Sequence, residues 1–175
     1  GPKKGKGLDI SDRRGLLLIS GIPASGKTNF CRYLAERYDF AHYDMEQYPN
    51  GWPFPGLKNS WDRSRKEFVD DLIKRHNRVA IDWGFPPCMI SWVLELQSAG
   101  VKVIWFLADI KKARTIFINR GTGHVSDFDR QVFLIRQSRL PEALDAIIIN
   151  ALTDTGKYRR PKDIARDIFE RMQAS

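Results

Sequence analysis

The sequence has few of the features that mark several protein classes. Only two of its 175 residues are cysteines, Cys31 and Cys88, and their spacing matches neither a disulfide framework nor a metal motif. No apolar run approaches the ~18 residues that a membrane span requires, and no signal-peptide pattern opens the chain. Internal repeats and low-complexity tracts are missing too. We therefore expect a cytoplasmic protein.

The rest of the composition is ordinary for a globular protein, with 42% hydrophobic and 29% charged residues. The first two residues, Gly1-Pro2, resemble the remnant of a cleaved purification tag, and residues 1–12 are predicted to be a flexible leader. Residues 13–175 are predicted to form a single domain, as a monomer or weak dimer.

The net charge of +8 is unevenly distributed along the chain. Residues 1–110 hold 16 basic and 13 acidic residues, whereas residues 111–175 hold 13 basic and 8 acidic residues. The basic residues of the second part include Arg114, Arg120, Arg130, Arg136 and Arg139. Such a field favours polyanions, either nucleoside triphosphates or nucleic acid, and the charge does not choose between them.

Strand-like and helix-like segments alternate from residue 16 onward. The predicted strands cover residues 16–20, 40–43, 79–82, 101–107 and 146–149. The predicted helices cover residues 27–38, 62–76, 89–99, 111–120, 129–138 and 161–172. This alternation predicts an α/β fold with a five-stranded parallel sheet and helices on both faces. In such folds ligands bind at the carboxyl ends of the strands.

The most specific motif is Gly21-Ile22-Pro23-Ala24-Ser25-Gly26-Lys27-Thr28, which fits the phosphate-loop pattern G-x-x-x-x-G-K-T. It stands between a buried strand and an amphipathic helix, which is the context that the motif requires. The glycines let backbone N–H groups point at phosphate oxygens, and the helix start adds its positive dipole end. Lys27 is expected to reach the β- and γ-phosphates of ATP, and Thr28 to place its hydroxyl on Mg²⁺.

A carboxylate closes the third predicted strand. Asp82 occupies the usual position for an acid that holds Mg²⁺ or its waters, so Thr28 and Asp82 are the predicted metal residues. The chain has no Asn-Lys-x-Asp motif for reading guanine, and the segment after the last strand, residues 150–154, does not supply one. A GTPase is therefore disfavoured.

Taken together, these motifs resemble the small P-loop kinases of the nucleoside-monophosphate-kinase-like group. The group includes shikimate, gluconate and adenylate kinases, polynucleotide 5′-kinases, antibiotic phosphotransferases and zeta-toxin kinases. The resemblance spans about residues 15–172 and rests on residues 21–28, on Asp44 and on residues 81–86. The stretch from Asp82 resembles the Asp-Gly-Phe-Pro-Arg of adenylate kinases, with Trp83 inserted and Pro87 in place of the arginine. This departure argues against a monophosphate acceptor bound in the adenylate kinase manner.

The resemblance implies a P-loop three-layer sandwich with an arginine-bearing lid, which the loop between Arg120 and Arg130 is expected to form, and it implies ATP and Mg²⁺. Asp44 fills the place of the acid that contacts the acceptor hydroxyl, although it could instead only cap residues 45 onward. Arg120 aligns with the lid arginine that contacts ATP, and Arg114 is expected to flank the adenine. Glu46 is expected to face solvent.

The predicted acceptor region comprises residues 44–61, part of the following helix and residues 83–88. It is rich in aromatic residues: Trp52, Phe54, Trp61, Trp83 and Phe85. These side chains either stack on a base or ring of the acceptor, or form a hydrophobic cluster that fixes the loops. Likewise, Arg63, Arg65 and Lys66 either bind an anionic acceptor or belong to a solvated helix face.

The sequence therefore predicts an ATP-dependent kinase that transfers the γ-phosphoryl group to a hydroxyl of a small-molecule or nucleoside-type acceptor. Two alternatives stay open. One is a kinase that acts on an RNA or DNA end, which the basic second part and the aromatic loops favour. The other is an ATPase switch whose hydrolysis controls a partner.

Overall fold

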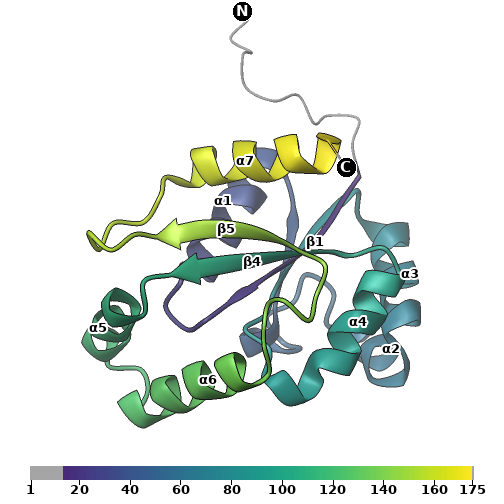
Figure 1. Cartoon of the computed structure of the whole chain (residues 1–175). Helices are drawn as coiled ribbons and strands as arrows, with labels where there is room; N and C mark the ends of the chain where they lie inside the picture. The colour runs from purple at the N-terminus through teal and green to yellow at the C-terminus, as the bar shows by residue number, and fades with distance from the viewer. Residues whose placement is uncertain (1–13, 175) are drawn as a thin grey trace, which may run out of the picture.

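The short apolar segments of the sequence form one parallel sheet (Figure 1). In the computed structural model, which describes residues 14–174, the sheet has five strands in the order β2-β3-β1-β4-β5. These are β1 (Gly15–Gly21), β2 (Ala41–Asp44), β3 (Arg78–Asp82), β4 (Lys102–Ala108) and β5 (Ala146–Leu152). All paired strands run parallel, as the strand–helix alternation predicted.

Helices cover both faces of the sheet. The helices α1 (Lys27–Tyr38) and α7 (Pro161–Ala174) lie on one face, at the top of Figure 1. The other face is covered by α2 (Lys58–Arg63), α3 (Arg65–Arg75), α4 (Ile90–Ser98) and α6 (Val125–Gln137). The remaining helix, α5 (Ile110–Arg120), stands near the carboxyl ends of β4 and β5. The predicted α/β three-layer sandwich is thus confirmed.

Strand β1 separates two hydrophobic cores because successive side chains of a strand point to opposite faces. Leu17 and Ile19 belong to the core under α1 and α7. Leu18 belongs to the larger core on the other face. All three side chains are completely buried, which explains why the strand reads as a continuous apolar run.

The strand register brings three motif residues to the same edge of the sheet. Asp44 at the end of β2 pairs with Asp82 at the end of β3, and Asp82 pairs with Ile19 of β1. Gly21, where the phosphate loop starts, ends β1 two residues later. The carboxyl edge therefore collects the residues that the sequence singled out, in agreement with the general rule for ligand sites in parallel sheets.

One predicted helix proves to be two. The helix expected over residues 62–76 is interrupted at Ser64, whose backbone is extended (φ −167°, ψ 135°). The Ser64 hydroxyl accepts a hydrogen bond from the Glu67 N–H at 3.3 Å and so caps the start of α3. The upstream part begins earlier than predicted, at Lys58. A cap that satisfies a free backbone N–H outweighs continuation of the helix here.

The expected lid segment is shorter than predicted. The helix placed at residues 129–138 begins at Val125, so that only residues 121–124 join α5 to α6. Gly121 ends α5 with a left-handed backbone (φ +65°). Closure of this segment over a nucleotide stays a prediction.

Two expectations from the sequence concern the chain as a whole. The predicted leader, residues 1–12, lies outside the described residues. Within residues 14–174, every helix is too short or too polar to cross a bilayer.

Candidate functional site

The phosphate loop, residues 21–28, turns sharply between β1 and α1. Three of its residues have positive φ angles: Gly21 (+146°), Ala24 (+63°) and Gly26 (+94°). A Cβ atom on Gly21 would lie 2.6 Å from the backbone oxygen of Phe106, a distance at which a carbon atom clashes with the oxygen. Glycine is therefore required at the first position, and the loop encloses a cradle at the N-terminus of α1.

Lys27 is held against this loop. Its Nζ donates a hydrogen bond to the backbone oxygen of Ile22 at 2.9 Å. Burial lowers the pKa of the ammonium group, and the carboxylates of Asp82 and Glu46 act in the opposite direction. On the other side, Gly84 lies so close that a Cβ there would come within 3.3 Å of Lys27 Cε. The lysine is thus positioned by both the phosphate loop and the segment after β3.

A cavity of about 500 Å³ opens over the loop. Its floor is formed by the phosphate loop and the first turn of α1, including Lys27 and Thr28. Its walls include Arg32 from the next turn of α1 and, from three other parts of the chain, Glu46, Asp82, Gly84, Arg120 and Thr122. Lys27, both predicted metal residues and Arg120 therefore line one cavity, large enough for a small-molecule ligand, whereas Asp44 is not among its lining residues.

Asp82 is a buried carboxylate, with 3% of the residue exposed. Its Oδ2 lies 2.9 Å from Nε2 of His42, which comes from the neighbouring strand β2. The thiol of Cys31 on α1 lies in the same cluster. Burial raises the pKa of this thiol well above its usual range, and the Asp82 carboxylate adds to the shift. The sequence analysis missed His42, because only the pairing of β2 with β3 places it beside Asp82.

The carboxylate of Asp44 is fixed locally. Its Oδ1 accepts a hydrogen bond from the Glu46 N–H at 2.9 Å, so Asp44 does cap the turn that follows it. Burial and the neighbouring Asp82 raise the pKa of the Asp44 carboxyl, while the Glu46 N–H, His42 and Arg32 lower it in part. Glu46 is exposed, as expected, but it also lines the cavity.

Of the two arginines expected to contact the nucleotide, the structure brings one to the cavity. Arg120 lines the wall and stands beside Tyr158, where it moderates the raised pKa of the phenol. Arg114 instead forms an ion pair with Asp129 of α6, with Nε and Nη2 at 2.9 and 3.1 Å from the two carboxylate oxygens. Arg114 is not among the residues that line the cavity, and its expected place beside an adenine stays a prediction.

Tyr158 is a further residue that the sequence analysis missed. It lies in the loop between β5 and α7, and its hydroxyl donates a hydrogen bond to the Ala24 carbonyl oxygen in the phosphate loop at 2.7 Å. Its ring packs 3.2 Å from where a Cβ on Gly26 would stand. The two loops on this side of the cavity are thus joined by one side chain.

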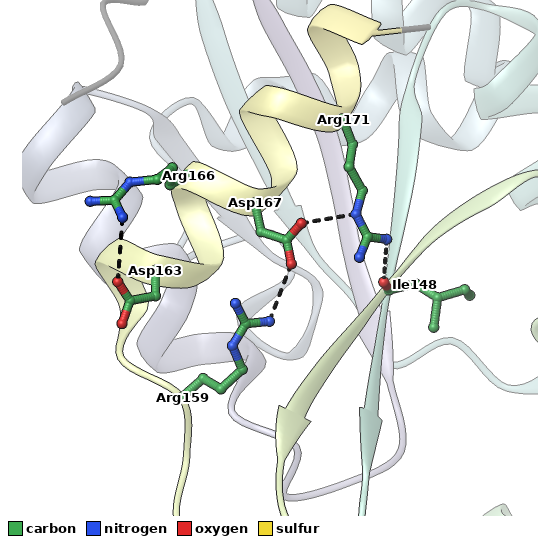
Figure 2. A network of polar contacts seen from close by, with 6 residues as sticks. All are labelled: Ile148, Arg159, Asp163, Arg166, Asp167 and Arg171. Carbon is green, nitrogen blue, oxygen red and sulfur yellow. Dashed lines mark hydrogen bonds and ion pairs between the residues drawn. The ribbon is translucent and has the colours of Figure 1, made fainter. Parts of the chain in front are cut away.

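The loop that carries Tyr158 is tied to α7 (Figure 2). Asp167 accepts hydrogen bonds from Arg159, which follows Tyr158, at 3.2 Å and from Arg171 at 2.9 Å. Arg171 in turn donates to the backbone oxygen of Ile148 in β5 at 2.6 Å. This network holds the loop to the sheet, and with it the position of Tyr158.

The aromatic residues of the acceptor region form a core cluster. Trp52, Trp61 and Phe85 are 3–4% exposed, and their rings contact one another through Phe68, Tyr43 and Trp83. Phe54 is exposed, and the guanidinium of Arg75 lies 4.4 Å from its ring centre. The sequence left two roles open for these rings, stacking on the acceptor or fixing the loops. The three buried rings belong to a hydrophobic cluster that fixes the loops.

The cations of the same region have partners as well. Arg65 is buried, donates to Glu95 at 3.0 Å and lies 3.7 Å from the ring centre of Trp92. Arg63 and Lys66 form ion pairs one helical turn ahead, with Glu67 and Asp70. These residues stabilise α3 and its contact with α4.

Several solved structures share this architecture. Shikimate kinase from Acinetobacter baumannii, in complex with shikimate, matches 94% of this chain and 96% of its own chain, with a TM-score of 0.60 and 13% identity. A sugar kinase from Janibacter matches 91% and 94%, with a TM-score of 0.59 and 16% identity. A gluconokinase from Sinorhizobium meliloti matches 91% and 93%, with a TM-score of 0.55 and 12% identity.

The chain shares the fold of these P-loop kinases. No family model and no curated protein sequence matches the chain. Identities of 12–16% establish the P-loop kinase fold alone. The reaction has to be argued from the residues of the site.

Proposed function

We propose that this protein is an ATP-dependent kinase that transfers the γ-phosphoryl group to a hydroxyl of a small-molecule acceptor. The observation that carries the proposal is the joint position of Lys27, Thr28 and Asp82 on one cavity above a phosphate loop. The shikimate kinase, sugar kinase and gluconokinase that share the fold support the same class of reaction.

The residues present fit a nucleotide with Mg²⁺. The loop leaves no room for a Cβ at Gly21, and its positive φ angles suit backbone N–H groups that converge on phosphate oxygens. The Thr28 hydroxyl and the Asp82 carboxylate would hold Mg²⁺, since hard oxygen donors are what this ion prefers. When bound, Mg²⁺ neutralises charge on the phosphate oxygens.

The chain's own residues then have distinct tasks. Lys27 and Arg120 bring positive charge to the phosphate side of the cavity, where phosphoryl transfer needs it. Asp44 orients the acceptor hydroxyl and takes its proton as the acceptor oxygen bonds to the γ-phosphorus. The bond from that phosphorus to the bridging oxygen breaks, and ADP leaves. The raised pKa of Asp44 suits a group that accepts a proton.

The alternative of a nucleic-acid end as acceptor loses part of its support. It drew on the aromatic loops, yet Trp52, Trp61 and Phe85 are buried in one core cluster and offer no free ring face for stacking. A small-molecule acceptor requires no such face. We therefore favour the small molecule and treat the nucleic-acid end as an arm of the test.

The proposal is tested by incubating the protein with γ-labelled ATP and separate acceptor pools. The pools are sugars and polyols, hydroxy acids, nucleosides, and oligonucleotides with a 5′-hydroxyl. Label is expected in one of the small-molecule pools, and no label should appear there with Lys27→Ala. Transfer only to oligonucleotides would favour the nucleic-acid kinase. Hydrolysis without label in any pool would contradict a kinase and favour the ATPase switch.

A further inference from the structure

Three metal-binding side chains converge beneath the phosphate loop. Cys31 comes from the middle of α1, His42 from β2 and Asp82 from the end of β3, and their ligand atoms all lie within 4.8 Å of one another. Cys31 and Asp82 are buried, and the His42 side chain is 19% exposed. The three elements are held together by the core and by the β2–β3 pairing, so the cluster is built by the fold.

The donor set differs from that of a magnesium site. Thiolate sulfur and imidazole nitrogen are poor ligands for Mg²⁺ but suit Zn²⁺ and similar ions, which bind Cys, His and Asp together. A tetrahedral Zn²⁺ site places nitrogen and oxygen ligands about 3.3 Å apart and sulfur at ~3.6 Å from either, given the usual bond lengths. In the structure His42 Nε2 lies 2.9 Å from Asp82 Oδ2, and no two ligand atoms of the cluster are more than 4.8 Å apart. The distances of a tetrahedral site fall between these two values.

We propose that Cys31, His42 and Asp82 form a binding site for a borderline-soft divalent ion of the Zn²⁺ type. Of the three side chains, Asp82 lines the cavity, so we place the fourth position of the ion on that side. Formation of the metal–sulfur bond releases the thiol proton to solvent. The ring proton of His42 moves to Nδ1, so that Nε2 binds the ion. No electron is transferred.

An ion bound at Cys31, His42 and Asp82 would inhibit the kinase reaction, an expectation that rests on the proposed function. Asp82 cannot serve the soft ion and the Mg²⁺ of a bound nucleotide at the same time. The Lys27 ammonium, close enough to Asp82 for the carboxylate to raise its pKa, would also lie beside the soft ion. We therefore expect Zn²⁺ to compete with Mg·ATP, so that raising the Mg·ATP concentration relieves Zn²⁺ inhibition.

The site is tested without nucleotide by titrating the whole protein with Co²⁺, a spectroscopic substitute for Zn²⁺. The wild type is expected to bind about one equivalent, with the visible bands of tetrahedral Co²⁺ and a near-ultraviolet thiolate-to-metal band. Cys31→Ser should abolish the thiolate band. His42→Gln should weaken Co²⁺ binding by at least ~10-fold. Removing a residue that only hydrogen-bonds to a metal ligand already weakens metal binding by ~10-fold or more, and His42 is proposed to be a ligand itself.

Cys88→Ser is the matched control, because Cys88 is the exposed cysteine and stands outside the cluster. It should leave the titration unchanged, and thermal unfolding without metal verifies that each variant is folded. Absence of a thiolate band in the wild type, or its loss in Cys88→Ser alone, would overturn the site. Co²⁺ binding without phosphoryl transfer would instead uphold the site and refute the kinase, so the two failures are distinguishable.

Discussion

Asp44 and Asp82 are neighbours at the ends of paired strands, but their surroundings give them different chemistry. Asp82 is buried and has the imidazole of His42 as a hydrogen-bond partner. Asp44 is partly exposed and is held by a backbone N–H, and both burial and the charge of Asp82 raise its pKa. We propose that these unlike environments divide the tasks, with Asp82 binding the metal and Asp44 taking the proton.

This division predicts the behaviour of Asp44→Asn. The amide keeps the shape but cannot take the proton, so transfer should fall by ~10²–10⁴-fold while ATP affinity stays nearly intact. Because the carboxylate must be ionised to act, wild-type transfer should decline as the pH falls through the raised pKa of Asp44. The variant should lose that dependence. Binding, hydrolysis and transfer are measured side by side over a pH series.

An unchanged transfer rate in Asp44→Asn would leave Asp44 with only its capping bond to Glu46. A loss of hydrolysis equal to the loss of transfer, with no labelled acceptor, would point to the ATPase switch. Glu46→Gln is the matched comparison, since Glu46 lines the cavity but is exposed. We expect a smaller effect there.

At the residue scale, the sequence predicts those site residues that belong to a contiguous motif. Gly21, Gly26, Lys27 and Thr28 are recognisable because one loop and one helix start create the cradle. His42 and Cys31 carry no local signal for their place beside Asp82, because it arises from strand register and helix packing. Such contacts become visible only in the folded chain.

Among the elements, the break between α2 and α3 shows how a local rule was overlooked. The segment Ser64-Arg65-Lys66-Glu67 has the S-x-x-E pattern of a helix start, within what reads as one amphipathic helix. The sequence predicts an apolar stripe of Phe68, Leu72 and Ile73 on this helix, and Phe68 and Leu72 are buried, whereas Ile73 is 37% exposed. Periodicity identified the face of the helix, and the cap decided where it begins.

The cap predicts a stability effect for Ser64→Ala. The variant loses the bond to the Glu67 N–H, and an N-cap of this kind contributes about 1 kcal/mol. Urea denaturation should show a lower midpoint that corresponds to a loss of about 1 kcal/mol in the free energy of unfolding, with an unchanged slope. Ser91→Ala provides the control, because Ser91 is an exposed residue inside α4. Equal stability of Ser64→Ala and wild type would show that α3 does not depend on this cap.

The sequence located the strands and helices well and their ends less well. Strand β1 and helix α1 lie where they were predicted, since buried apolar runs and the phosphate-loop context define them. The start of α6 was placed four residues late, because residues 125–128 hold only Val125 and Phe128 as apolar signals. The consequence is a shorter connection next to Arg120 than the lid prediction assumed.

On the scale of the whole molecule, the site joins the beginning and the end of the described chain. Tyr158 donates to Ala24 across 134 residues of sequence, and Asp167 of α7 fixes the loop that carries Tyr158 (Figure 2). The sheet order makes this possible, because β1 lies in its centre and β4 and β5 follow on one side. No sequence pattern predicts a contact between single residues so far apart.

The central claim is that the phosphate loop binds Mg·ATP, and calorimetric titration tests it most directly. Wild-type protein should bind Mg·ATP, and Lys27→Ala should weaken binding by about 10–100-fold, since hydrogen bonds to charged groups contribute ~1.5–3 kcal/mol. Lys102→Ala should bind as the wild type does, because Lys102 is exposed at the amino end of β4, opposite the cavity. Wild-type affinity in Lys27→Ala, or no binding by the wild type, would contradict the account.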